Sequence, residues 1–244
     1  MDLIVGTSRA GPLVSILEDD SKDWRAAYYK HPEISSIKGA VYPGAKLKKV
    51  TTESIKLMRT LSAQEELRPV MIYMVCGMPD TTEMIVDYYR GVRYEEVITT
   101  EPPQQTAQRV IEELEDSSRG LITAGAIPVF ATVAPISFES WNTYRMNVKR
   151  RTSHLIHYKE YENMQEIHNT AVAEINSHIV FMNSRTGVNT PHLASYVLQK
   201  RGWGLPYRFR HKRLYDGCHT CPFTTDKWVE EMISTITRNR VMFA

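Results

Sequence analysis

Three continuous apolar runs stand out along the chain, and each is bounded by glycine, proline or a polar turn. Residues 2–6 (DLIVG) stop at Gly-Thr-Ser, residues 69–77 (PVMIYMVCG) lie between proline and glycine, and residues 127–135 (IPVFATVAP) end at a proline. Runs of this kind are typical of parallel strands that are covered on both faces. A weaker run at residues 34–41 (ISSIKGAV) precedes Tyr-Pro-Gly and predicts a further strand.

Between these runs the apolar positions recur at helical spacing. The segment TESIKLMRTLS has apolar residues three to four positions apart, and QTAQRVIEELEDSSRG is amphipathic over its whole length. The predicted helices cover residues 52–62, 105–120 (closing at Gly120), 161–182 and 190–200 (capped by Thr190), and a last helix runs through Trp228.

Strands and helices alternate from end to end, without a repeat or a Pro/Gly/Ser-rich linker. This order predicts an α/β fold, a three-layer α/β/α sandwich whose central, mostly parallel, flavodoxin-like sheet has about five strands. We expect a single domain over residues 1–244. The fifth strand falls either at residues 178–183 (HIVFMN) or at residues 207–214, because periodicity alone does not separate the two.

The composition adds few constraints. The 244 residues are 42% hydrophobic and 24% charged, with a formal net charge of +2, which gives no global attraction to nucleic acid or membranes. Three cysteines do not make a disulfide framework. The sequence shows neither a signal peptide nor the roughly 20 apolar residues of a membrane span. We therefore expect an intracellular protein, by default a cytoplasmic one.

Candidate chemistry gathers where the predicted strands end. In sheets of this kind ligands bind outside the carboxyl ends of the strands. Ser8 follows the first strand, Gly44 follows the second and Gly77 the third, while Asp216 and His219 precede the last helix. A serine, a histidine, a carboxylate and backbone N–H donors are the groups that covalent acyl transfer needs. Their order along the chain is no obstacle, since triads recur on unrelated folds in different orders.

These blocks resemble those of the SGNH, or GDSL-type, hydrolases. They read Gly6-Thr7-Ser8, Gly44, Gly77-Met78-Pro79-Asp80 and Asp216-Gly217-Cys218-His219, and together they cover nearly the whole chain. The resemblance implies a catalytic triad of Ser8, His219 and Asp216, with the backbone N–H groups of Ser8 and Gly44 in the oxyanion hole. The stretch NSRTGVNTPHL also resembles divergent domains of this type that mobile genetic elements and some viruses encode.

Two positions depart from the family pattern. Thr7 replaces an aspartate, which we expect to affect loop packing more than chemistry. Pro79 replaces the asparagine that would be the third oxyanion donor, and proline has no N–H to offer. Losing one such donor typically costs about 10²–10³-fold in rate. The hydroxyl of Thr81 or Thr82 is a candidate replacement, and Asp80 is expected to have a structural role.

The resemblance therefore implies a serine ester hydrolase of the esterase, lipase or acetylesterase class with a weakened oxyanion hole. Its expected substrate is a small-molecule, lipid or carbohydrate ester, and the chemistry requires neither metal nor cofactor. Arg9, Gly77 and Thr81 are expected to contact the substrate, because they follow strand ends in these blocks.

Cys218 and Cys221 have the C-x-x-C spacing of zinc and redox sites. A structural zinc site requires four ligands, and the chain has no second Cys/His pair of matching spacing. A redox pair usually opens a helix directly after a strand near the start of a thioredoxin-like unit, which is not the context here. The favoured interpretation is two ordinary thiols beside a catalytic histidine.

An alternative function rests on basic clusters at residues 145–151 (RMNVKRR) and 207–213 (YRFRHKR). The second interleaves aromatic and basic side chains, a pattern that can stack bases and follow phosphates. In this alternative the protein is a catalytically impaired SGNH-like module used for nucleic-acid binding or assembly. The residues expected to contact nucleic acid are Arg208, Arg210, Lys212 and Arg213.

Overall fold

A computed structural model describes residues 2–19, 38–63, 71–94, 102–136, 161–197 and 222–243. Within these ranges five parallel strands form one sheet, in the order β2-β3-β1-β4-β5. The strands are β1 (Asp2–Gly6), β2 (Ser15–Asp19), β3 (Lys38–Val41), β4 (Met71–Val75) and β5 (Ile127–Phe130). The predicted α/β fold with a five-stranded parallel sheet is confirmed.

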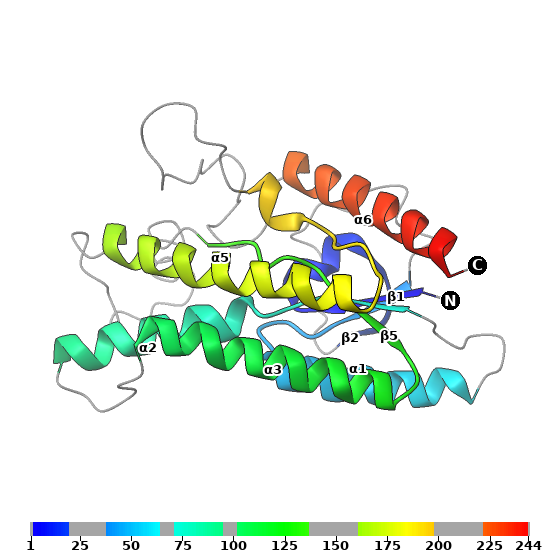
Figure 1. The fold of residues 1–244 in the computed structure, drawn as a ribbon, viewed down its shortest axis with the longest axis horizontal. Helices are drawn as coiled ribbons and strands as arrows, with labels where there is room; N and C mark the ends of the chain where they lie inside the picture. Colours follow the sequence, from blue (N-terminus) through cyan, green and yellow to red (C-terminus); the bar gives the residue numbers. More distant parts are fainter. Residues whose placement is uncertain are drawn as a thin grey trace.

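Helices cover both faces of the sheet (Figure 1). One layer contains α1 (Leu47–Ser62), α2 (Met78–Tyr94), α3 (Pro103–Thr123) and α5 (Tyr161–Arg185). The other contains α6 (Pro222–Met242) and the short 3₁₀ segments η1 (Ser8–Leu13) and η7 (Leu193–Tyr196). The predicted three-layer sandwich is therefore confirmed as well.

Strands β1, β4 and β5 are apolar at nearly every position because each face of the sheet meets a helical layer. Successive side chains of a strand point to opposite faces. Leu3 and Val5 of β1 accordingly belong to the core under α1, α3 and α5, whereas Ile4 belongs to the core under α6. Ile72 and Tyr73 of β4 divide in the same way.

The fifth strand is β2, which neither predicted segment contains. Residues 178–183 are helical, inside α5, so a strand there is wrong, and residues 207–214 lie outside the described ranges. Strand β2 pairs in parallel with β3 and places Ser15 level with Lys38, the residue that also faces Leu3 of β1. The chain therefore returns along the sheet between β1 and β2. Segment η1 makes this return, since six residues of 3₁₀ helix rise about 12 Å, the length of about four strand residues.

Several predicted helix boundaries are wrong: the helix expected at residues 52–62 begins at Leu47, and the one expected at residues 161–182 continues to Arg185. The helix that was expected to close at Gly120 continues to Thr123, and the chain leaves it through Gly125, whose φ of 92° is in the left-handed region that glycine tolerates. The helix expected at residues 190–200 is only the four-residue η7 within the described chain. Thr190 does not cap it, because its hydroxyl instead accepts a hydrogen bond from Nδ2 of Asn183 at 3.0 Å.

Helix α5 holds the chain of β5 through side-chain amides. Asn183 bonds both the N–H and the C=O of Phe130, at 3.1 and 2.8 Å. Asn176 does the same for Val133, at 2.7 and 3.0 Å. Seven helical residues rise about 10.5 Å and three extended residues span about 10 Å, so the two spacings match. These amides satisfy backbone groups at the edge of the sheet that a further strand would otherwise pair.

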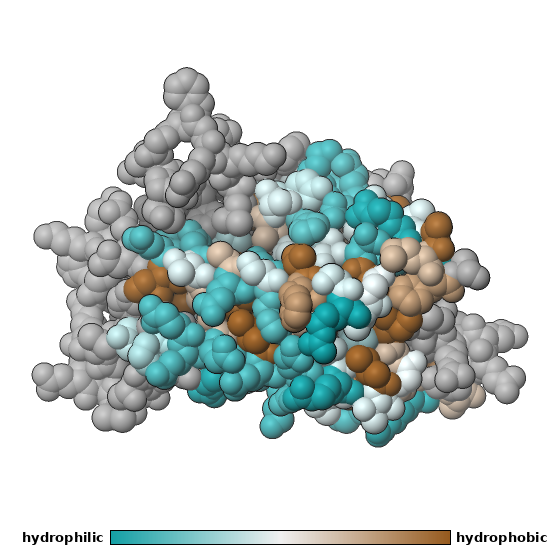
Figure 2. Space-filling view, viewed as in Figure 1, coloured by the Kyte–Doolittle hydropathy of each residue, from teal (hydrophilic) through white to brown (hydrophobic). Residues whose placement is uncertain are grey.

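Figure 2 shows the face of the molecule that α3 and α5 form, and its described part is mainly hydrophilic with single hydrophobic side chains between. The exposed large hydrophobic residues of α3 and α5 include Ile122, Val180 and Phe181, and the ring of Phe181 lies under the guanidinium of Arg185 at 5.7 Å. Single exposed hydrophobic residues are normal on protein surfaces. Over the ranges that the structure describes, no helix combines the length and apolarity needed to cross a membrane.

Candidate active site at the carboxyl edge of the sheet

The three central strands β3, β1 and β4 end at the same edge of the sheet, and each is followed by a residue that the sequence singled out. Ser8 comes two residues after β1, Gly44 three after β3 and Gly77 two after β4. The parallel pairing matches Gly6 with Val41 on one side and with Val75 on the other. The structure thus brings the three strand-end blocks to neighbouring positions, as parallel topology requires.

Ser8 is the first residue of η1 and is half-buried. The residue before it is anchored to the neighbouring strand, because the N–H of Thr7 donates to the carbonyl of Val75 at 3.1 Å. The carbonyl of Thr7 accepts from the N–H of Ala10 at 2.9 Å, which closes the first turn of η1. Thr7 itself is buried. Ser8 therefore stands on a tight strand-to-helix turn.

Gly44 lies in an exposed turn whose backbone only glycine adopts easily, with φ of 68°. This turn begins where the N–H of Tyr42 donates to the carbonyl of Gly6 at 2.8 Å, and it closes through the N–H of Ala45 and the carbonyl of Tyr42 at 3.1 Å. The chain after β3 is thus tied to the chain end of β1. Helix α1 starts three residues after Gly44, at Leu47.

Asp80 fixes the start of α1 from the neighbouring block. Both of its carboxylate oxygens lie 3.1 Å from the N–H of Leu47, which would otherwise lack a partner at a helix start. Burial raises the pKa of Asp80 to about 6, against the opposing effect of the Leu47 hydrogen bond, and Glu113 raises it further. The expected structural role of Asp80 is thereby specified: it joins the loop of Gly77 to the loop of Gly44.

Gly77 also has a left-handed backbone, with φ of 90°, and α2 begins directly after it. Pro79 occupies the second position of α2 and is buried, which is a place where a helix needs no N–H. The hydroxyl of Thr81 donates to the carbonyl of Gly77 at 3.0 Å, and Oγ1 of Thr82 lies 3.3 Å from Nε2 of His168. Both candidate replacement hydroxyls are thus engaged with protein groups.

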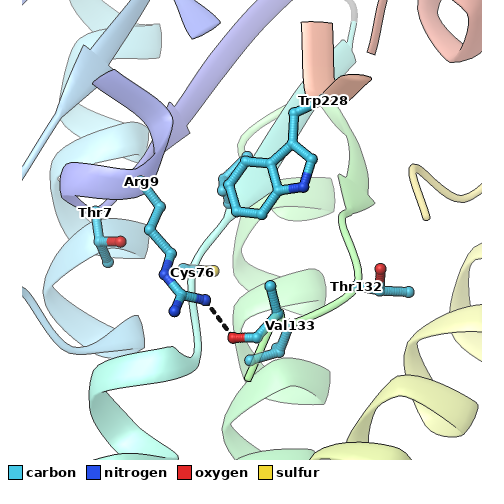
Figure 3. A pocket seen from close by; sticks show the side chains of 8 residues that line it. Thr7, Arg9, Cys76, Thr132, Val133 and Trp228 are labelled. Atoms are coloured by element: carbon cyan, nitrogen blue, oxygen red, sulfur yellow. Dashed lines mark hydrogen bonds between the residues drawn. The ribbon is translucent and has the colours of Figure 1, made fainter. Parts of the chain in front are cut away.

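Arg9 extends from η1 across the carboxyl edge of the sheet (Figure 3). Its side chain is almost completely buried, and its two terminal nitrogens donate to consecutive carbonyls after β5, those of Ala134 and, at 3.1 Å, Pro135. A small hollow of about 10 Å³, partly open to solvent, lies here. Thr7, Arg9, Val75, Cys76, Thr132, Val133, Ala134 and Trp228 line it.

Two buried titratable groups, His168 and the Cys76 thiol that lines this hollow, are kept neutral. Burial lowers the pKa of His168 to about 3, and the positive charge of Arg9 lowers it as well. Burial raises the pKa of the Cys76 thiol far above its usual range, and Asp80 adds to the increase. A thiol in this state is a poor nucleophile and a poor metal ligand. Within the described ranges no group of three His, Cys, Asp or Glu side chains is placed to hold a metal ion.

The remaining predicted residues lie outside the described ranges. These are the acid and base Asp216 and His219, the thiols Cys218 and Cys221, and the basic residues Arg208, Arg210, Lys212 and Arg213. The described chain resumes at Pro222 with α6, whose Trp228 lines the same hollow as Thr7 and Arg9. The indole N–H of Trp228 donates to the carbonyl of Leu193 at 3.0 Å, which fixes this turn of α6.

Sequence reasoning missed the polar contacts that support this edge. The partners of Arg9 are carbonyls 125 and 126 residues away, so no local pattern points to them. One signal was present in the sequence: Asn176 and Asn183 lie seven residues apart on an otherwise apolar helix face.

No protein-family model matches the chain, and no curated protein matches it. Its structure is similar to a putative acylhydrolase from Bacteroides fragilis, with TM-score 0.59 and 10% identity over 97% of this chain and 86% of the other. It is also similar to a GDSL-like lipase from Bacteroides thetaiotaomicron, with TM-score 0.55 and 9% identity over 97% and 85%. The OSK domain of Drosophila Oskar matches at TM-score 0.47 and 10% identity, over 95% and 86%.

Similarity at this level of identity shows the fold alone and says nothing of the reaction. The chain has the SGNH/GDSL-type fold that its sequence blocks predicted.

Proposed function

We propose that the protein is a serine ester hydrolase, built as a single domain of the SGNH type. One observation carries the proposal: Ser8, Gly44 and Gly77 follow three adjacent parallel strands at one edge of the sheet. Ser8 stands there on a strand-to-helix turn, the arrangement that exposes a nucleophile at the top of an α/β sheet. The fold shared with an acylhydrolase and a lipase agrees with this function.

The proposed base and acid come from the chain just before α6. His219 precedes Pro222 by three residues, and α6 packs against η1, the segment that carries Ser8. In the proposed reaction His219 takes the proton of Ser8 as Oγ attacks the ester carbonyl, and Asp216 orients the imidazole. The N–H groups of Ser8 and Gly44 stabilise the oxyanion. His219 then protonates the leaving alcohol, and a water molecule, activated by the same histidine, hydrolyses the acyl-enzyme.

No metal or organic cofactor takes part in this scheme. The substrates that fit it are esters of small O-acyl groups or of lipid acyl chains. Hydrolysis of a p-nitrophenyl acyl ester tests the proposal directly. We expect wild-type protein to release p-nitrophenol and Ser8→Ala to fall to the background rate while it keeps the circular-dichroism spectrum of the wild type. Equal rates for the two folded proteins would contradict a nucleophilic role of Ser8.

The oxyanion hole gives a second prediction. Pro79 supplies no donor, and its place in the first turn of α2 needs no proline, so Asn is compatible with the backbone there. We expect Pro79→Asn to raise kcat on the same ester by about 10-fold or more, since one oxyanion donor is typically worth 10²–10³-fold. Pro79→Ala is the matched control, because it changes the backbone restriction without adding a donor. An equal kcat for both variants would show that another group already fills the position.

A further inference from the structure

We propose that Arg9 is a positioning residue for Ser8, and that the consecutive carbonyls of Ala134 and Pro135 are its anchor. This inference rests on the proposed function, because it concerns the placement of the proposed nucleophile. Arg9 is joined to Ser8 by a peptide bond, and its guanidinium bonds the segment after β5, which lies two strands away from β1.

The two neighbours of Ser8 are both tied down, in different directions. Thr7 is bonded through its N–H to the end of β4, and Arg9 is bonded through its side chain to the chain beyond β5. Ser8 therefore lies between two anchors that span the three strands β1, β4 and β5. A turn held on both sides restricts the positions that Oγ of Ser8 can reach.

The anchor itself is held firmly. Ala134 and Pro135 lie between two residues that α5 binds. Asn176 hydrogen-bonds both backbone groups of Val133. Nε2 of Gln165 donates to the carbonyl of Ile136 at 2.8 Å. The residues from 131 to 136 are buried. The carbonyls that accept hydrogen bonds from Arg9 thus belong to a fixed segment. We call the Arg9 guanidinium and these two carbonyls the clamp. Through the clamp, the position of α5 restricts the position of η1.

Arginine suits this clamp better than lysine. Its planar guanidinium presents several donors in a fixed fork, which matches two consecutive carbonyls, whereas an ammonium group acts as a single point. Charged donors form shorter and stronger hydrogen bonds than neutral ones, and burial strengthens them further. His168 is neutral, because burial and the positive charge of Arg9 lower its pKa. A second buried positive charge is thereby avoided.

The effect on the proposed reaction follows from geometry. Attack requires the nucleophile within a few tenths of an ångström of its productive position, and a displacement of about 1 Å can cost 10²-fold in rate. We expect Arg9→Met to lower kcat by about 10²-fold and Arg9→Lys by about 10-fold, both with nearly unchanged KM. A residue that only stabilised the fold would leave kcat of the folded fraction unchanged.

A matched pair on α5 keeps the test decisive if Arg9→Met does not fold. Asn176→Ala loosens Val133, the residue before Ala134, while Asn183→Ala loosens Phe130, three residues earlier on the same chain. Each variant removes one amide that makes two backbone hydrogen bonds, but Asn183 also donates to the Thr190 hydroxyl and is more deeply buried, so we expect the larger loss of melting temperature for Asn183→Ala. The clamp predicts a fall in kcat of about 5- to 10-fold for Asn176→Ala and none for Asn183→Ala.

The experiment compares wild type, Arg9→Lys, Arg9→Met, Asn176→Ala and Asn183→Ala in fluorophosphonate labelling rate, in kcat and KM on a p-nitrophenyl ester, and in thermal unfolding. A reduced kcat in both Arg9 variants and in Asn176→Ala, with an unchanged kcat in Asn183→Ala, supports the clamp. A labelled wild type together with equal kcat in all folded variants overturns the clamp and leaves the proposed function standing. Absence of labelling in the folded wild type overturns both.

Discussion

The two edges of the sheet hold their polar groups in different ways. At the amino-terminal edge, side chains of the strands bond to side chains of α6: Nε of Arg240 donates to the carboxylate of Asp2 at 2.6 Å, and Nδ2 of Asn239 donates to the Tyr73 hydroxyl at 3.3 Å. At the carboxyl edge, side chains bond to the backbone of loops, as Arg9 and Asp80 show.

The contacts at the two edges therefore have different roles: those at the amino-terminal edge stabilise the fold, and those at the carboxyl edge also fix the candidate site. The contacts at the amino-terminal edge join the first strand of the chain to its last helix, and they lie away from Ser8. Those at the carboxyl edge fix the turns that follow β1, β3 and β4, where small displacements matter to the proposed chemistry. Substitutions at the first edge should therefore change stability alone, and substitutions at the second should change both stability and turnover.

The largest effect is expected at Trp228, on the carboxyl side. The side chain is almost fully buried, donates to the carbonyl of Leu193 and lines the hollow beside Arg9. Trp228→Ala should lower the free energy of unfolding by about 3–5 kcal/mol and slow ester hydrolysis. Urea denaturation measures the first effect, with Trp228→Phe as a control that keeps most of the apolar volume. A loss below about 1 kcal/mol would show that the hollow collapses at little cost.

Asp80 should make the carboxyl edge sensitive to pH. Its pKa is raised by burial from the ordinary value near 3.8 to about 6, so the folded state binds a proton more tightly than the unfolded chain does. The stability that this gives is fully present below about pH 4 and is lost as the pH rises through 6. A shift of this size corresponds to about 3 kcal/mol.

Asp80→Asn isolates that contribution, because the amide keeps one acceptor for the N–H of Leu47 and does not titrate. We expect the unfolding free energy of the wild type to fall by up to about 3 kcal/mol, relative to the variant, between pH 4 and pH 7. Urea unfolding at each pH provides the measurement. A constant difference across this range would mean that the carboxylate is not desolvated as described.

Asn239 tests the amino-terminal edge, with the smallest expected effect. It is completely buried, and its Oδ1 accepts from the backbone N–H of Asn189 at 2.7 Å. Asn239→Ala leaves that donor and the Tyr73 hydroxyl without this partner, which should cost about 1–3 kcal/mol. The kcat of the folded protein should equal that of the wild type. A clear fall in kcat would show that the two edges are coupled.

The general architecture could be predicted because the strongest signals are local. Strands β1, β4 and β5 are apolar runs that end in turn residues, and Gly44 and Gly77 mark the ends of β3 and β4. The sequence blocks then placed Ser8 at the correct edge of the sheet. These features depend on a few neighbouring residues, which a single sequence displays.

Strand β2 and helix α2 were missed for identifiable reasons. Strand β2 reads SILED, too short and too polar to stand out, and it follows the turn of Ser8, where a helix or loop is equally plausible. Helix α2 begins Met-Pro-Asp and contains Gly91, both of which suggest a loop, although proline is tolerated in a first helical turn. Residues 178–183 belong to α5, which contacts the chain of β5 through asparagine side chains and the core through aliphatic ones. Its polar residues therefore do not gather on one face, and the helical period is hard to recognise in this segment.

The supporting contacts of the site could not have been predicted. The bond from Arg9 to Ala134 joins residues 125 positions apart, and the bond from Asp80 to Leu47 joins 33. Both depend on the strand order, which the sequence leaves open until the sheet is assembled. Tertiary contacts of this kind decide how firmly a turn is held, and composition or periodicity carries no trace of them.

The central claim is that Ser8 is a nucleophile, and covalent labelling tests it most directly. After treatment with a fluorophosphonate and digestion with trypsin, the label should appear on the peptide Met1–Arg9, which contains Thr7 and Ser8 as its hydroxyl residues. Fragmentation of that peptide should place the label on Ser8, and Ser8→Ala should remain unlabelled. Folded wild-type protein that takes up no label, or that carries it elsewhere, would contradict the account.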